Sequence, residues 1–180
     1  MRKLIFLLVF LLLAGAYYHP ASAQRQPHSQ AVYCELLGPS QGIGFSYDAR
    51  IKKGARDGFG FRAGLGLGYA YSSSILTFDL DGDIYNQMFR LAVPLEINYL
   101  VGKKASKFEV GAGTAICADR YTSESGAKPE TAFGALPYLS LGYRLVTDKG
   151  FLFRAGVLPF YNFSSNNLRI YPYLSFGWAF

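Results

Sequence analysis

The chain has 180 residues, of which 51% are hydrophobic and 17% are aromatic, and it contains 20 glycines. Its formal net charge is +6, and this falls to +4 (16 basic against 12 acidic residues) when Arg2 and Lys3 of the first segment are set aside. Such a mild balance excludes any argument from charge for a nucleic-acid-binding protein, and we expect no nucleic-acid partner.

The first 23 residues have the pattern of a cleaved signal peptide. Arg2 and Lys3 precede an apolar run from Leu4 to Ala16, and Ala21-Ser22-Ala23 forms an A-x-A cleavage site. The run is shorter than the roughly 20 apolar residues that a membrane-spanning helix needs. We therefore expect a signal peptide at 1–23, a polar leader at 24–30 and one folded domain at 31–180.

The folded domain alternates apolar and polar or small residues, which is the pattern of β-strands. Alternation is clearest in four segments, Gly60–Ser72, Met88–Leu100, Lys107–Asp119 and Phe151–Phe163. It is weaker in four others, Ala31–Gly38, Gly42–Ile51, Ala135–Val146 and Leu168–Phe180. These eight strands, most of them long enough to cross a bilayer at a tilt, predict an antiparallel barrel.

The predicted connections alternate between short and long. Compact turns are expected at Lys52–Asp57, Gly102–Ser106 and Thr147–Gly150, and longer links at Ser72–Tyr85 and Tyr121–Gly134. The remaining links, Pro39–Gln41 and Ser164–Asn167, are very short. Short turns on one side and longer loops on the other are typical of outer-membrane barrels, and an even strand number places both termini on the periplasmic side.

The charged residues indicate which face of each strand points inward. Those within the strands all fall opposite the apolar face: Glu35, Asp48, Arg50, Arg62, Arg90, Glu96, Glu109, Asp119, Arg144 and Arg154. The lysines fall instead in turns, loops or strand ends, whereas a soluble lipocalin-like barrel would crowd its outer face with Lys and Glu. We therefore predict an all-β, eight-stranded, up-and-down transmembrane barrel with a filled polar lumen and a lipid-facing apolar surface.

Aromatic residues are expected near both ends of the strands, as interface girdles require. One set lies toward the periplasmic side (Tyr99, Phe108, Tyr143, Phe151, Trp178 and Phe180) and another toward the outer side (Tyr69, Tyr71, Tyr161 and Phe163). Four prolines inside the strands cannot donate a backbone hydrogen bond, and we interpret them as bulges or rim positions: Pro94, Pro137, Pro159 and Pro172.

Three features that suggest a site have simpler explanations. The glycines of Gly64–Gly68 keep strict alternation and open into no helix, so they predict a smooth lumen wall rather than a nucleotide-binding turn. Asp79–Asp83 lacks the glycine and glutamate of a calcium loop, which leaves a solvated acidic loop with at most weak divalent-cation contact. Cys34 and Cys117 fall on opposite faces of distant strands, so we expect two free thiols. We expect no cofactor and no metal.

The positions of the two histidines bear on whether the protein is an enzyme. His19 lies in the expected signal peptide, which leaves only His28 in the polar leader before the barrel. Outer-membrane deacylases, palmitoyltransferases, phospholipases and omptin proteases use histidine as a general base. We therefore expect no enzyme, and we interpret the lumen charges as structural ion pairs in which Glu35, Arg62, Arg90, Glu96, Glu109, Arg144 and Arg154 pair across the lumen.

The segment from about residue 31 to Phe180 resembles the small eight-stranded outer-membrane barrels, the OmpA-transmembrane-domain and OmpX-like group. The residues that carry the resemblance most strongly are the terminal "YLSFGWAF", with Leu174, Phe176, Trp178 and Phe180 at alternate positions. They look like the C-terminal β-signal that the Bam assembly machinery reads. The first strand and turn, "VYCELLGPSQGIGFSYDARI", also resemble barrel proteins of Bacteroidetes-type bacteria. The resemblance covers the barrel part of the OmpA group, and we expect no C-terminal peptidoglycan-binding domain of the kind that this group carries.

The resemblance implies an integral protein of the Gram-negative outer membrane, in contact with lipid and lipopolysaccharide and expected to be a monomer. Our leading hypothesis is a non-enzymatic barrel with a structural or surface-interaction role in the cell envelope. Three alternatives stay open: a porin-like narrow barrel that passes small or apolar solutes, a lipid-modifying enzyme and a soluble ligand-binding barrel.

Overall fold

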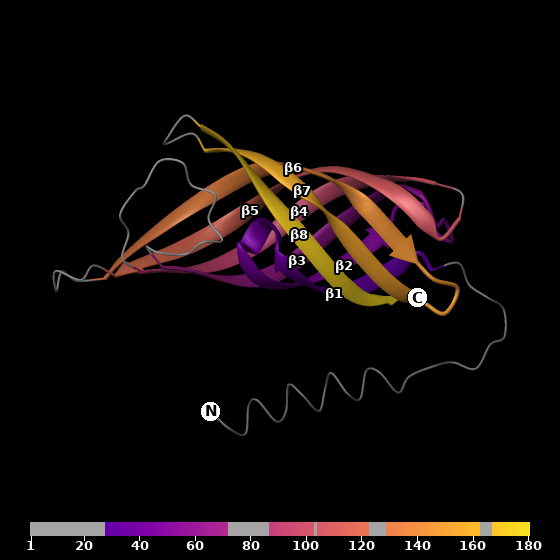
Figure 1. The fold of residues 1–180 in the computed structure, drawn as a ribbon, viewed down its shortest axis with the longest axis horizontal. Coiled ribbons are helices and arrows are strands. Elements are labelled where there is room, and N and C mark those ends of the chain that lie inside the picture. Colours follow the sequence, from indigo (N-terminus) through magenta and orange to yellow (C-terminus); the bar gives the residue numbers. More distant parts are fainter. Residues whose placement is uncertain (1–27, 72–86, 103, 123–128, 163–166) are drawn as a thin grey trace, which may run out of the picture.

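The structure, a computed structural model, describes residues 28–71, 87–102, 104–122, 129–162 and 167–180. These residues form eight antiparallel strands that close into a single barrel (Figure 1). The strands are β1 (Gln30–Leu37), β2 (Gly42–Arg50), β3 (Gly58–Tyr71), β4 (Gln87–Val101), β5 (Ser106–Thr122), β6 (Glu130–Val146), β7 (Phe151–Asn162) and β8 (Asn167–Ala179). The predicted eight-stranded up-and-down barrel is confirmed. Within the described ranges no helix is both long and apolar enough to cross a membrane.

The barrel closes where its first and last strands meet. Strand β1 pairs antiparallel with β8 from Ala31 opposite Ala179 to Leu37 opposite Tyr173. Two further hydrogen bonds, Gln30 N to Phe180 O (3.0 Å) and Phe180 N to Gln30 O (2.8 Å), extend this seam to the end of the chain. The start of β1, the C-terminus, the turns at 51–57 and 147–150, the end of β4 and the start of β5 share one end of the barrel, here named the termini end. The opposite end is the loop end.

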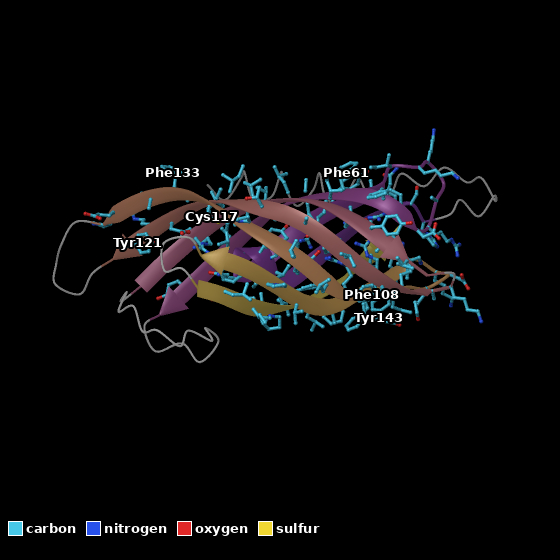
Figure 2. All side chains as sticks on the ribbon, turned by 90° about the horizontal axis from the view of Figure 1, so that it is seen from above. Phe61, Phe108, Cys117, Tyr121, Phe133 and Tyr143 are labelled. Atoms are coloured by element: carbon cyan, nitrogen blue, oxygen red, sulfur yellow. The ribbon has the colours of Figure 1, made fainter. Side chains whose placement is uncertain are left out.

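Alternation along each strand separates an exposed outer face from a buried inner face. Phe45, Leu65 and Ile97 on the outer face are 68%, 62% and 62% exposed, whereas the inward-facing Arg62 and Arg154 are 1% and 0% exposed. Apolar side chains cover the outside and charged ones fill the inside, which is the reverse of a soluble domain. The labelled side chains of Phe61, Phe133 and Tyr143 lie on this outer surface (Figure 2).

Exposed aromatic residues gather at the termini end as predicted, where Tyr99, Phe108, Tyr143, Phe151, Trp178 and Phe180 are all exposed. At the loop end Tyr69 is exposed, and Phe89 and Phe133, which the prediction omitted, join it. The side chains of Tyr71, Tyr161 and Phe163 lie outside the part of the chain whose side chains are described.

The strand hairpins of the loop end differ greatly in length. Strands β5 and β6 have 17 residues each, whereas β1 and β2 have 8 and 9. The predicted loop Tyr121–Gly134 is therefore wrong in extent, because β5 continues to Thr122 and β6 begins at Glu130. Phe133 is the only large apolar residue in that part of β6, so the alternation is too weak to mark the strand. The predicted loop at Ser72–Tyr85 lies outside the described residues.

The link between β1 and β2 turns into the barrel instead of lying over its rim. It forms a short 3-10 helix, η1 (Gly38–Ser40), all of whose residues are buried (the indigo coil in Figure 1). Leu37, Gly38 and Gln41 adopt positive φ angles of 65°, 53° and 57° to make this inward bend. Because the hairpin is short, η1 lies within the lumen and contacts β2, β3, β4, β5, β7 and β8.

All four strand prolines lie where a hydrogen-bond ladder is interrupted or ends. The β3–β4 ladder breaks at Pro94 and the β6–β7 ladder breaks at Pro159, with the same register on both sides of each break. Pro137 and Pro172 each lie one residue beyond the last pair with a neighbouring strand. Pro94 and Pro159 are therefore not bulges, because no residue is inserted; each break accommodates the missing N–H.

Candidate functional site: the charged lumen

The ten charged residues singled out from the sequence all point into the lumen. Nine of them are buried and Arg90 is half-buried. They share this direction because each occupies the strand positions that alternate with the exposed apolar residues. The structure therefore brings together side chains from seven strands in one enclosed space.

The first half of the network joins β4, β3, β1 and β7. Glu96 accepts a hydrogen bond from Arg62, whose other terminal nitrogen lies 3.0 Å from Oε2 of Glu35. The same Glu35 oxygen accepts a hydrogen bond from Arg154 (3.1 Å) and one from Ser175 of β8 (3.2 Å). Two arginines on opposite sides of Glu35 thus share one carboxylate.

The second half runs from β7 to β2. Glu109 accepts hydrogen bonds from Arg154 (2.6 and 3.0 Å) and from Arg144 (2.8 and 3.1 Å). Arg144 also donates to both oxygens of Asp48, at 2.8 and 3.0 Å. Arg50 donates a further hydrogen bond to Asp48 and is the last member of the network. Strands β6 and β2 lie on opposite sides of the eight-stranded ring, so the Arg144–Asp48 pair crosses the lumen.

Together these contacts form one chain of alternating charge, here named the charge chain: Glu96, Arg62, Glu35, Arg154, Glu109, Arg144, Asp48 and Arg50. It contains four cations and four anions and is therefore neutral. Burying an ion pair costs desolvation energy, which strong geometry and additional hydrogen bonds offset. Multiple bonds at Glu109 and Asp48 supply that compensation, and the charge chain ties seven strands together directly and β8 through Ser175.

The buried guanidinium groups of Arg154 and Arg62 lie over the faces of tyrosine rings. The guanidinium carbon of Arg154 lies 4.6 Å from the ring centroid of Tyr33 and 5.0 Å from that of Tyr173. Arg62 lies 5.9 Å from the ring of Tyr138 and donates a hydrogen bond to its hydroxyl at 3.1 Å. Cation–π contacts of this kind are stronger when the cation is shielded from water, as these are.

Arg90 lies apart from the charge chain, which corrects the prediction that it pairs with Glu35, Glu96 and Glu109. It forms a bidentate ion pair with Asp119, with distances of 2.6 and 2.7 Å. Its remaining terminal nitrogen donates to Oε1 of Gln41 at 2.6 Å. Arg90 and Asp119 therefore hold the inward turn that contains η1. Asp48 and Arg50, which were not predicted to take part in the pairing, are members of the charge chain.

On the loop-end side of the charge chain, the lumen is filled mainly by apolar side chains, beside the Arg90–Asp119 pair and η1. A buried cluster fills its loop-end half and consists of Ala92, Ala115, Cys117, Tyr138, Leu158, Phe160, Tyr171 and Tyr173. Gly66 and Gly68 make room for η1, since a Cβ at either position would lie 2.3 Å from an atom of Ser40. The glycine run was predicted to form a smooth lumen wall, and at these two positions the turn packs against that wall.

Sequence reasoning did not single out four polar residues that complete the lumen. Asn98 donates to Asp48 (2.7 Å) and accepts from Arg50, while Tyr138 and Ser175 bond to members of the charge chain. Lys107, at the termini end of β5, is only 4% exposed. The same alternation that identified Glu109 places Lys107 on the inner face, so this signal was available.

The residues of the expected β-signal lie along the outer face of β8 and at the C-terminus. Phe176, Trp178 and Phe180 are 43%, 51% and 51% exposed, and Leu174 is half-buried. Both cysteines are free as predicted, with Cys117 buried in the lumen and Cys34 half-buried. The acidic segment Asp79–Asp83 lies outside the described residues, and the described part of the chain holds no cluster of three residues suited to bind a metal.

The closed eight-stranded barrel has a counterpart among solved structures. The crystal structure of the N-terminal β-barrel domain of Pseudomonas aeruginosa OprF superposes with a TM-score of 0.60, covering 86% of this chain and 98% of that one. The chain has the OprF barrel fold. Sequence identity is 12%, so the likeness concerns the fold. No family model matches the sequence, and no curated protein matches it.

Proposed function

We propose that the protein is an integral β-barrel of the Gram-negative outer membrane with a non-enzymatic, structural or surface-interaction role in the cell envelope. The proposal rests on one observation above all, the apolar outer surface of a closed barrel. Closure leaves every strand paired around the ring, which is the arrangement that allows a sheet to reside in hydrocarbon.

The chemistry of the outer surface favours lipid over water. Large apolar side chains are exposed on all eight strands, including Val32, Phe45, Leu65, Leu91, Ile116, Leu139, Val157 and Phe176. Soluble monomers rarely expose contiguous apolar patches larger than a few hundred Å². The aromatic residues at the termini end resemble the girdles of outer-membrane barrels, which supports the same environment.

The contents of the lumen support a structural role over transport or catalysis. The charge chain crosses the barrel from β2 to β6, and its carboxylates are engaged by arginines instead of being free for general acid or base work. His28, the histidine outside the expected signal peptide, contacts the backbone oxygen of Asp148 at 3.1 Å at the termini end. A narrow solute pathway would have to break this network.

Further parts of the proposal follow from the sequence resemblance. They include membership of the small OmpA/OmpX-like barrels, here of the Bacteroidetes type, recognition of the C-terminal strand by the Bam machinery, contact with lipopolysaccharide, a monomeric state and periplasmic termini. The fold likeness to the OprF domain supports them only in outline.

Cell fractionation combined with heat-modifiable gel mobility tests the proposal. We expect the mature protein in the outer-membrane fraction, resistant to extraction without detergent, and migrating differently before and after boiling because the folded barrel persists in dodecyl sulfate. Extraction into detergent-free buffer as a folded monomer would contradict the proposal and favour the soluble-barrel alternative.

A further inference from the structure

Lys107 is the one buried charged residue that the described part of the barrel leaves without an ion-pair partner. The charge chain is neutral and Arg90 pairs with Asp119, so the other buried charges are balanced. Lys107 is 4% exposed and its Nζ donates to the backbone oxygen of Lys104 at 3.1 Å. A partly buried ammonium without a counter-charge carries a desolvation cost, which an anion bound beside it would offset.

The Lys107 side chain lines a small cavity in the mouth of the barrel at the termini end. The cavity has a volume of about 20 Å³, opens toward solvent and is lined in part by Arg50, Arg56, Arg144 and His28. Asp48 is the one carboxylate among the cavity-lining residues, and it already accepts hydrogen bonds from Arg50, Asn98 and Arg144. Arg50, Arg144 and Asp48 belong to the neutral charge chain, so the surplus positive charge of the cavity wall comes from Lys107 and Arg56.

The wider surroundings do not remove this surplus. The charged groups that act most strongly on Lys107 are the cations Arg144, Arg56 and Arg50 and a single anion, Asp57. Arg144 is also the direct cross-strand neighbour of Lys107. Arg56 contacts Asp148 at 3.6 Å, but both side chains are largely exposed, so that pair is weak. The C-terminal carboxylate on Phe180, next to the cavity-lining Ala179, forms no ion pair within the described residues.

We propose that this mouth is an anion-binding site that takes a phosphate group, with Lys107 and Arg56 as its principal ligands. Phosphate suits the donors, because it offers several acceptor oxygens to the ammonium and the guanidinium that line the same cavity. His28 lines the same cavity, where its Nε2 atom donates a hydrogen bond to the backbone oxygen of Asp148 at 3.1 Å. A cavity of about 20 Å³ holds a group of the size of one phosphate oxygen, and the rest of the phosphate would lie at its open mouth.

Titration calorimetry on the folded barrel tests this site. Heat-modifiable gel mobility first establishes folding in zwitterionic detergent, so a failure of phosphate binding is distinguishable from a failure of the membrane proposal. Separate titrations use inorganic phosphate, glycerol 3-phosphate and dihexanoyl phosphatidylglycerol at low ionic strength, with chloride as the reference anion. Preference for the first two identifies a free phosphate compound, and preference for the third identifies a lipid headgroup.

Lys107→Met removes the charge and keeps the length of the side chain, and Lys149→Met is the matched control at the same end, because Lys149 is exposed and does not line the cavity. We expect Lys107→Met to weaken phosphate binding about tenfold or more and Lys149→Met to leave it unchanged. Phosphate should also raise the unfolding midpoint of the unaltered protein and not of Lys107→Met.

Arg56→Met provides a second variant if Lys107→Met does not fold, and it should weaken binding as well. Absence of saturable phosphate binding to the unaltered protein overturns the proposal. Equal weakening by Lys149→Met also overturns it, since that result indicates a diffuse charge effect instead of a site. Unchanged binding by both Lys107→Met and Arg56→Met has the same consequence.

Discussion

Glu109 shows how a single residue can stabilise a barrel from within. It is fully buried and accepts four hydrogen bonds, all from Arg144 and Arg154. Glu96 stands at the end of the charge chain, with Arg62 as its ion-pair partner and with its Oε1 atom unbonded. The two glutamates are similarly buried, so they differ mainly in the number of arginines that depend on them.

This difference predicts unequal costs of neutralisation. We expect Glu109→Gln to lower the free energy of unfolding by about 3 kcal/mol, because it leaves two buried guanidinium groups short of charge. Glu96→Gln should cost less, because Glu96 pairs with one arginine, Arg62, whereas Glu109 pairs with two. Urea unfolding of the refolded barrel in lipid vesicles measures both variants. An equal loss for the two substitutions would show that position along the charge chain is unimportant.

At the scale of elements, the hairpin β1–β2 is the irregular part of the barrel. Its strands are half the length of β5 and β6, and its turn occupies the lumen that longer strands would leave open. The bonds from Arg90 to Gln41 and Asp119 anchor the turn across the lumen. The strained φ angle of Leu37 persists because these contacts and the tight packing over β3 determine the path of the chain.

Substitution of Gly66 tests this packing. A valine there would place its Cβ 2.3 Å from Cβ of Ser40, so we expect Gly66→Val to displace η1 and to destabilise the barrel by about 1–3 kcal/mol. Gly134→Val is the control, because no atom lies within 4 Å of the position of its Cβ. The unfolding free energies are compared in the same vesicles. A Gly66→Val barrel as stable as the control would refute the close fit of the turn.

The C-terminal strand combines two roles that the structure allows to be separated. Phe180 closes the β1–β8 seam through its backbone and exposes its ring on the outer surface. Under the proposed β-signal role, Phe180→Ala should reduce outer-membrane assembly in cells while leaving refolding into vesicles intact, because the backbone bonds remain. Deletion of Phe180 should impair both. Heat-modifiable mobility in each setting provides the measurement, and normal assembly of Phe180→Ala in cells would remove the β-signal proposal.

At the scale of the whole molecule, the lumen is filled in layers. An apolar cluster and η1 occupy the loop-end half, and the charge chain lies below them. Because neither layer leaves an open path among the described residues, we expect no discrete channel steps when the purified barrel is inserted in a planar bilayer, with a large porin as the positive control. Regular open-channel steps from the unaltered protein would favour the transport alternative.

The strands and the inward-facing residues could be predicted from the sequence more fully than the contacts between side chains. Strand number and the inward direction of the ten charged residues follow from alternation, which is a local property of the pleated backbone. The extension of β6 to Glu130 was missed because small residues weaken the pattern there. The partners of the charges could not be predicted, as Arg90 shows, because partners depend on register and on which strands face each other across the ring.

The sequence by itself determined the closed, eight-stranded architecture and the division between an apolar exterior and a charged interior, because each residue's face depends only on its position in its own strand. Tertiary structure alone decided which charges meet, as in the pair Arg144–Asp48, whose members are 96 positions apart. It also decided that the first hairpin turns inward and that Lys107 is left without a carboxylate. These outcomes depend on the stagger of strands around a ring, which brings distant residues to the same height in the lumen.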